Sequence, residues 1–211
     1  MFYDRKEAGQ LLGAALIKYR NLKPVVLAIP RGGVPIGYEV AKILKAPLDV
    51  AITKKIGHPE NSEYAIGALG VKGYALNETA IGIPEVYLSK EIRRVEKMVE
   101  KKNQSYHKDF PAVEIMDRWI ILVDDGVATG STILVTADLL AKQSPAGIIV
   151  AVPVAPEETV IRMKRNPSIH EVVCLHTPKY FRGVGQFYED FTPVEDSEAI
   201  GLLLKANSTE E

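Results

Sequence analysis

The residues best placed to do chemistry in this sequence are two adjacent carboxylates, Asp124 and Asp125. They follow Trp119–Val123, an apolar run that is too short for a helix and rich in β-branched residues, as a buried parallel strand is. A turn of small residues, Gly126 to Gly130, comes next, and an apolar helix is predicted from Ser131 to about Leu140. Acidic side chains at a strand end, beside a small-residue turn, indicate a ligand site.

The turn is suited to an anion. It has little side-chain bulk, so the backbone N–H groups from Ala128 to Thr132 can close around a phosphate, and the positive end of the helix dipole adds attraction. The hydroxyl groups of Thr129, Ser131 and Thr132 supply further donors. The two carboxylates can accept hydrogen bonds from a vicinal diol, such as the 2- and 3-hydroxyls of ribose. A phosphate at one end and a diol at the other describe a ribose 5-phosphate.

Two other loop types do not fit this segment. A P-loop requires a Lys directly after its last glycine, and Gly130 is followed by Ser131. A dinucleotide-binding turn requires three spaced glycines, whereas this turn has only Gly126 and Gly130. An ordinary strand, turn and helix, in which the acidic pair caps the helix, remains the alternative.

A second loop of the same kind follows the predicted strand Val25–Ile29. Arg31 offers a fork of hydrogen-bond donors beside the bare backbone of Gly32 and Gly33, and a helix with Pro35 in its first turn comes next. The sequence therefore predicts a second anion site here. A βα turn that is merely rich in glycine is the alternative.

A third strand, Leu48–Thr53, is predicted to run into Lys54 and Lys55. Neighbouring side chains on a strand point to opposite faces, so only one of these lysines can face a site, and we favour Lys54. A solvated lysine pair at a strand end is the alternative. Residues 64–71 and 74–76 are expected to form short antiparallel strands.

Strands and helices alternate along the chain, which predicts an α/β fold with a doubly wound, mostly parallel central sheet and flanking helices. Ligands of such folds bind at the carboxyl ends of the strands, where the segments of Arg31, Lys54 and Asp124 all end. A long, charged helix is predicted from Ser89 to about Lys108. Its apolar stripe is narrow, which indicates packing at the domain edge or against a second subunit, so a homodimer is one expectation.

Residues 119–132 closely resemble the 5-phosphoribosyl-1-pyrophosphate (PRPP) signature of type I phosphoribosyltransferases. The Arg31–Gly33 loop is similar to the loop that holds pyrophosphate in that family. The resemblance covers roughly residues 24 to 191. It implies one phosphoribosyltransferase-like domain over 1–211, in which 54–76 forms the flexible loop and 177–211 forms the base-side tail and closing helix. Lys54 would deliver positive charge to the departing pyrophosphate.

The resemblance also implies roles for the tail. Phe181, or Tyr180, would stack on a base, Val184 would line its pocket, and Asp190 would join Asp125 near Mg²⁺. One residue more than expected separates Gly185 from Asp190, so a structural loop that packs its aromatic rings on the sheet is the alternative. In the hypoxanthine-guanine branch an acidic residue takes the position of Ala128 and is proposed to handle the base proton. Its absence leaves the acceptor open.

The implied function is a Mg²⁺-dependent transfer of the phosphoribosyl group from PRPP to a nucleobase or similar nitrogen acceptor. The alternative is a non-catalytic regulator that binds PRPP. Composition sets limits on other classes: a net charge of −1 argues against a general nucleic-acid binder, and one cysteine, Cys174, excludes an internal disulfide. The polar N-terminus and the lack of a long apolar run argue against secretion and membrane insertion, so a cytoplasmic protein is expected.

Overall fold

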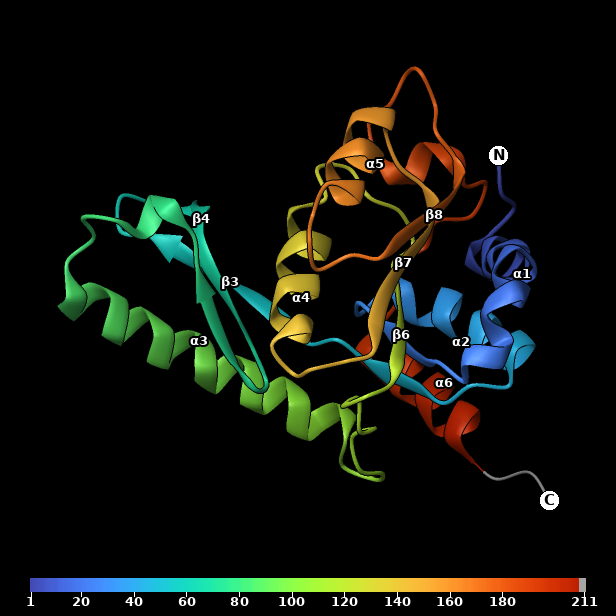
Figure 1. The fold of residues 1–211 in the computed structure, drawn as a ribbon, viewed down its shortest axis with the longest axis horizontal. Helices are drawn as coiled ribbons and strands as arrows, with labels where there is room; N and C mark the ends of the chain where they lie inside the picture. The colour runs from blue at the N-terminus through green and yellow to red at the C-terminus, as the bar shows by residue number, and fades with distance from the viewer. Residues whose placement is uncertain (209–211) are drawn as a thin grey trace.

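We describe residues 1–208 of the chain in a computed structural model, leaving aside the side chains of residues 62 and 63. The prediction of an α/β fold with a parallel central sheet is confirmed. Five parallel strands lie in the order β2-β1-β6-β7-β8 (Figure 1). Their bounds are β1 Val25–Ala28, β2 Leu48–Val50, β6 Trp119–Val123, β7 Gly147–Val154 and β8 Glu171–His176.

Helices cover both faces of this sheet. Alternate residues of each strand are therefore buried on opposite sides. Val26 and Ile121 belong to the core that α1, α2 and α6 cover, whereas Leu27 and Leu122 belong to the core that α4 and α5 cover. The bounds of these helices are α1 Arg5–Leu16, α2 Gly33–Leu44, α4 Ser131–Ala141, α5 Glu157–Lys164 and α6 Asp196–Asn207. Short 3₁₀ helices lie at η1 Ile17–Leu22, η2 Glu78–Ala80 and η3 Val184–Phe187.

The strand order places the site. From β1 the chain moves outward to β2, and from β6 it moves the other way through β7 to β8, so the winding reverses between β1 and β6. Ligands of open α/β sheets bind outside the carboxyl ends of the strands at such a reversal. The loops that begin at Ile29 and Asp124 are the two loops that follow β1 and β6.

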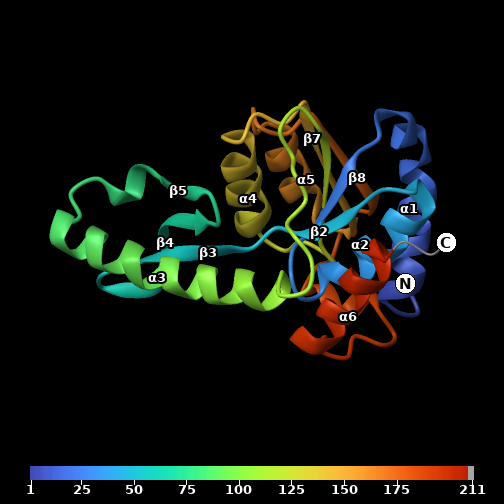
Figure 2. The same cartoon turned by 90° about the horizontal axis from the view of Figure 1, so that it is seen from below.

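An arm projects from the main sheet, as Figure 2 shows from below. It consists of an antiparallel sheet in the order β3-β4-β5, with the long helix α3 packed along β3 and β4. The bounds are β3 Thr53–His58, β4 Asn61–Gly70, β5 Gly73–Leu76 and α3 Glu85–Tyr106.

Two predicted boundaries in this region are wrong. The strand expected over 48–53 is split, because β2 ends at Val50 and the chain leaves the main sheet to start β3 at Thr53. Lys54 and Lys55 therefore lie in the arm. The long helix begins at Glu85 instead of Ser89, because Pro84, in an extended conformation, stands before the first turn and Glu85 favours the positive end of the helix dipole.

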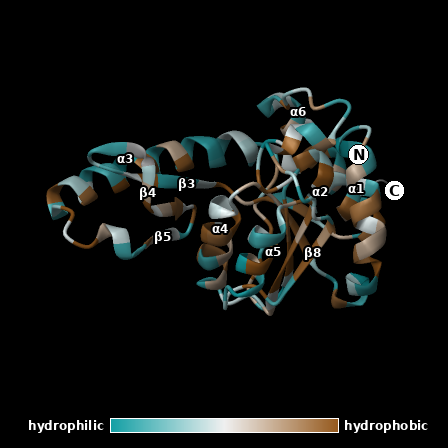
Figure 3. Cartoon of the chain, turned by 90° about the horizontal axis from the view of Figure 1, so that it is seen from above, coloured by the Kyte–Doolittle hydropathy of each residue, from teal (hydrophilic) through white to brown (hydrophobic). Residues whose placement is uncertain are grey.

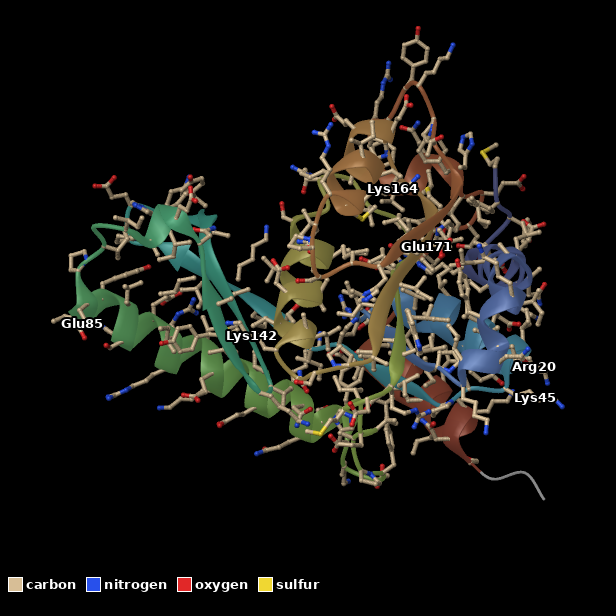
Figure 4. All side chains as sticks on the ribbon, in the orientation of Figure 1. Arg20, Lys45, Glu85, Lys142, Lys164 and Glu171 are labelled. Atoms are coloured by element: carbon tan, nitrogen blue, oxygen red, sulfur yellow. The ribbon has the colours of Figure 1, made fainter. Side chains whose placement is uncertain are left out.

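The arm is tied to the main sheet at its base. The Thr53 and Thr136 hydroxyl groups lie 3.0 Å apart, and Lys142 at the end of α4 donates to the Tyr74 carbonyl at 3.0 Å (Figure 4). Main-sheet strands are coloured hydrophobic in Figure 3, whereas α3 shows large hydrophilic stretches. Within residues 1–208 no helix combines the length and apolarity needed to cross a membrane.

A buried ion pair joins the end of α3 to β2. Asp49 accepts hydrogen bonds from the Val113 N–H and from His107 Nε2, both at 2.8 Å. The hydrogen bond to Asp49 is the main cause that raises the pKa of His107, and burial opposes it. A histidine whose folded-state pKa is raised stabilises the fold fully below its unfolded value, about pH 6.5, and this contribution disappears as pH rises through the raised pKa.

We therefore expect His107→Gln to lower the free energy of unfolding by about 2 kcal/mol below pH 6.5, which is typical of a charge-assisted hydrogen bond. The difference from the wild type should shrink as the pH rises through the raised pKa of His107. Urea unfolding of both proteins across this pH range measures the effect. A difference that grows with pH would contradict the assignment.

Candidate functional site

The two predicted anion loops are in direct contact. Ile29 N donates to the Val123 carbonyl at 2.9 Å, which extends the pairing of β1 and β6 to the start of both loops. A Cβ atom added to Gly32 would overlap Asp125 Oδ2, and one added to Gly33 would lie 2.9 Å from the Val123 carbonyl oxygen. The two glycines are therefore needed for the loops to approach each other. The Pro30–Arg31 peptide bond is cis.

Asp125 has a partner that the sequence did not reveal. Its Oδ2 accepts a hydrogen bond from Arg5 Nε at 2.9 Å and forms an ion pair with Arg5 Nη2 at 2.9 Å, and both side chains are largely buried. The Arg5 guanidinium lies 3.9 Å from the centre of the Phe191 ring and donates to the Thr192 carbonyl at 2.8 Å. Arg5 thus links the first helix, the acidic pair and the tail. No motif around Arg5 marks this role, because its partners lie more than a hundred residues away.

Two hydrogen bonds, one from the backbone of the acidic pair and one from the tail, hold the pair in place. Asp124 Oδ1 accepts from the Asp125 N–H at 2.9 Å, and the Tyr188 hydroxyl donates to the Asp125 carbonyl at 2.5 Å. Burial, followed by the charge of Asp125, raises the pKa of Asp124 well above its ordinary value. Burial also raises the pKa of Asp125, although Arg5 opposes it. Burial and the close approach of the two groups thus disfavour their ionised forms, which a polyhydroxyl or cationic ligand would stabilise.

The loop after the acidic pair presents unpaired donors. Gly130 has φ +73°, a conformation that glycine adopts without strain, and it precedes the first residue of α4. In the described part of the chain, no group accepts a hydrogen bond from the backbone N–H groups of residues 128–132. The Thr129 and Ser131 hydroxyl groups lie 3.2 Å apart, and both residues are exposed. Unpaired N–H groups at a helix N-terminus are an anion-binding arrangement.

Comparison with known proteins supplies the family. Residues 2–191 match the phosphoribosyl transferase domain family. The chain belongs to that family. A protein from Mycobacterium tuberculosis that carries a provisional phosphoribosyl transferase name is 34% identical over 98% of this chain, which spans about half (47%) of the relative's length.

Solved structures agree with the fold of this phosphoribosyl transferase domain. The protein TT1426 from Thermus thermophilus is 39% identical to this chain, with a TM-score of 0.87. The match covers 97% of this chain and 98% of that one. A hypothetical protein from Neisseria gonorrhoeae, solved with bound ppGpp, has a TM-score of 0.51 at 14% identity, and coverage is 97% of this chain and 96% of that one. The second likeness concerns the fold alone.

The neighbouring helix α5 supports the predicted phosphate loop, residues 126–132, of this phosphoribosyl transferase domain. The Thr159 hydroxyl donates to the Ala128 carbonyl at 2.7 Å, and a Cβ atom added to Gly130 would lie 3.0 Å from Thr159 Cγ2 and 3.6 Å from Arg162 Nη2. The Arg162 side chain is exposed, and its guanidinium makes no hydrogen bond or ion pair within residues 1–208. No sequence pattern marks Thr159 or Arg162 as part of this loop's surroundings, because both lie on a separate strand–helix unit, β7 and α5.

We expect Gly130→Ala to destabilise the domain by about 1–2 kcal/mol, because alanine tolerates a positive φ poorly and its methyl group would press on Thr159. Binding of a sugar phosphate should weaken in parallel as the loop shifts. Thermal unfolding with and without ribose 5-phosphate measures both effects. Unchanged stability together with unchanged ligand response would contradict the role given to this loop.

The lysine pair of β3 faces the predicted phosphate loop across a small cavity of about 100 Å³. Lys54 and Lys55 both contribute to its lining, as do Ser131 and Thr132 at the start of α4. Arg31 lies in the other loop and pairs with Glu195 at 3.3 Å. The predicted cations and the predicted phosphate loop therefore surround one edge of the sheet.

The three tail residues predicted to bind a base differ in their surroundings. Val184 packs behind the acidic loop, because a Cβ atom added to Gly126 would lie 2.5 Å from Val184 Cγ1. Phe181 stacks on Phe187, with ring centres 5.4 Å apart and planes 29° apart. Tyr180 is 86% exposed. One face of Phe181 is thus already covered by another ring, and its predicted contact with a base stays a prediction.

The donors available to a metal ion are few. In residues 1–208 no group of three His, Cys, Asp or Glu side chains is suitably placed for a metal ion. Asp190 Oδ1 accepts from the Thr192 N–H at 2.9 Å and the Thr192 hydroxyl at 2.6 Å. Asp124 Oδ2 and Asp125 Oδ1 have no hydrogen-bond partner in the described chain. Two free carboxylate oxygens fit Mg²⁺, which takes one or two carboxylates and keeps water and phosphate oxygens as its other ligands.

Proposed function

We propose that this domain binds PRPP with Mg²⁺ at the carboxyl edge of its main sheet and transfers the phosphoribosyl group to a nitrogen acceptor, such as a nucleobase. The observation that carries the proposal is the junction of two features: a run of unpaired N–H groups over residues 128–132 directly follows two carboxylates with free oxygens. The first feature fits a 5-phosphate, and the second fits the ribose diol or a hydrated Mg²⁺.

The reaction breaks the bond between the anomeric carbon and the pyrophosphate oxygen, and it forms a bond from that carbon to the acceptor nitrogen. The nitrogen loses its proton, and pyrophosphate leaves with the bonding electrons. Positive charge develops on the sugar ring, as in glycoside hydrolysis, and the carboxylates of Asp124 and Asp125 would stabilise it. Arg31 and Lys54 would neutralise the leaving group.

Mg²⁺ would be held by Asp124 and Asp125 together with pyrophosphate oxygens, and when bound it would neutralise charge on the leaving group. Asp190 stays a predicted second ligand. The Ala128 methyl group carries no proton-transfer function, so the acceptor proton would pass to water or to another side chain. The arm, with Lys54 and Lys55 on the site's edge, is the element suited to exclude water during transfer.

Pyrophosphate release from PRPP and Mg²⁺, measured across a panel of purine and pyrimidine bases, tests the proposal. We expect release with at least one base and none without a base. PRPP-dependent thermal stabilisation without release from any base would favour the alternative, a regulator that binds PRPP. Neither release nor stabilisation would contradict the assignment of residues 124–132 as a PRPP site.

A further inference from the structure

Lys102 of α3 lies where the arm meets the closing helix. Its side chain is 27% exposed, and Nζ lies 3.9 Å from Asp196 Oδ1 at the start of α6. Tyr106, one helical turn later, donates its hydroxyl hydrogen to the same oxygen at 2.6 Å. Figure 2 shows the carboxyl end of α3 beside the start of α6. The carboxyl end of the long charged helix therefore contacts the start of α6.

The residue before Asp196 holds a second cation in the same way. Glu195 Oε2 lies 3.3 Å from Arg31 Nη1, in the loop predicted to hold pyrophosphate. Two adjacent carboxylates thus pair with two cations from different segments, Arg31 after β1 and Lys102 on α3. Both carboxylates are well exposed, at 70% for Glu195 and 51% for Asp196. Exposed ion pairs of this kind are worth little, so a more highly charged anion can displace them.

Lys102 is also affected by the positive charges of Lys54 and Arg31. Burial is the main cause that lowers the pKa of Lys102, Asp196 opposes it, and the positive charges of Lys54 and Arg31 lower the pKa further. Three cations from three separate segments therefore share one region with two exposed carboxylates. A pyrophosphate group carries several negative charges and would relieve this repulsion.

We propose that Lys102 is a third cation of the pyrophosphate site, and that the Glu195 and Asp196 carboxylates occupy the anion position until pyrophosphate displaces them. This inference rests on the proposed function and adds a residue that the resemblance did not name. Lys102 would bind the pyrophosphate of PRPP as substrate and as leaving group. It would not affect the 5-phosphate, which binds at residues 128–132.

Lys102→Met tests the inference, because methionine keeps most of the side-chain stem and removes the charge. Lys101→Met is the matched control, since Lys101 is the exposed preceding residue of the same helix. Calorimetric titration with pyrophosphate, PRPP and ribose 5-phosphate, each with Mg²⁺, should show pyrophosphate and PRPP binding weakened about 10-fold in Lys102→Met. Ribose 5-phosphate affinity should stay unchanged in both variants.

A reverse variant sharpens the test. Asp196→Asn removes one competing carboxylate and should tighten pyrophosphate binding about threefold, whereas loss of a purely structural contact would not tighten it. Wild-type PRPP binding with equal pyrophosphate affinity in the Lys101 and Lys102 variants would overturn this inference alone. Failure of the wild type to bind PRPP or ribose 5-phosphate would contradict the proposed function, and this inference with it.

Discussion

Replacing Asp124 and Asp125 together by asparagine is expected to lower the rate of pyrophosphate release from PRPP about a thousand-fold, the range seen when a group that stabilises transition-state charge is removed. The two carboxylates are the negative charges that face the developing positive charge on the ribose ring in the proposed reaction. Asparagine keeps the shape and can still accept the Asp125 N–H bond through the side-chain oxygen of residue 124. Steady-state kinetics at saturating PRPP measure the loss.

Stability supplies the control for this experiment. Burial and the neighbouring Asp125 raise the pKa of Asp124, so its ionised form opposes folding, and stability falls as pH rises through the raised value. Asp124→Asn alone should therefore unfold at a higher temperature than the wild type at neutral pH, while activity falls. A variant that lost both stability and activity would indicate a structural role in place of the proposed catalytic one.

The second large effect is expected from Gly32→Ala. The new methyl group would overlap Asp125 Oδ2 and push that carboxylate away from Arg5. Breaking a largely buried ion pair while leaving one charge unpaired costs about 3 kcal/mol. The free energy of unfolding in urea should fall by that amount, and PRPP binding should be lost, because the two loops can no longer approach each other.

Gly201→Ala is the matched glycine control. It lies in α6, and a Cβ atom there would meet no atom within 4 Å. Alanine in a helix interior is favoured over glycine, so this variant should be more stable by up to about 1 kcal/mol. If Gly32→Ala proved as stable as the wild type, the close contact between the loops could not have the structural importance given to it.

The local parts of this site could be predicted from the sequence. Each anion loop is a contiguous strand, turn and helix, so the apolar runs ending at Ile29 and Val123 located both loops and the edge of the sheet. The same periodicity indicated the doubly wound sheet. These features depend on neighbours in the chain, which a single sequence displays.

The long-range parts could not be predicted. Arg5 reaches Asp125 from the first helix, and Lys102 reaches Asp196 from the arm, and no local pattern marks either pair. The split of the predicted third strand depends on the chain leaving the main sheet after Val50, which tertiary packing decides. Charged residues are spread along the whole of α3, so the sequence does not single out one of its lysines. Only the fold determines that Lys102 lies beside Asp196.

The crystal structure of the domain with PRPP and Mg²⁺ is the most direct test of the central claim. We expect the 5-phosphate oxygens within hydrogen-bond distance of the N–H groups of residues 128–132, and the ribose hydroxyls or the Mg²⁺ on Asp124 and Asp125. PRPP bound at another part of the chain, with the loop from Asp124 to Thr132 free of ligand, would contradict the account.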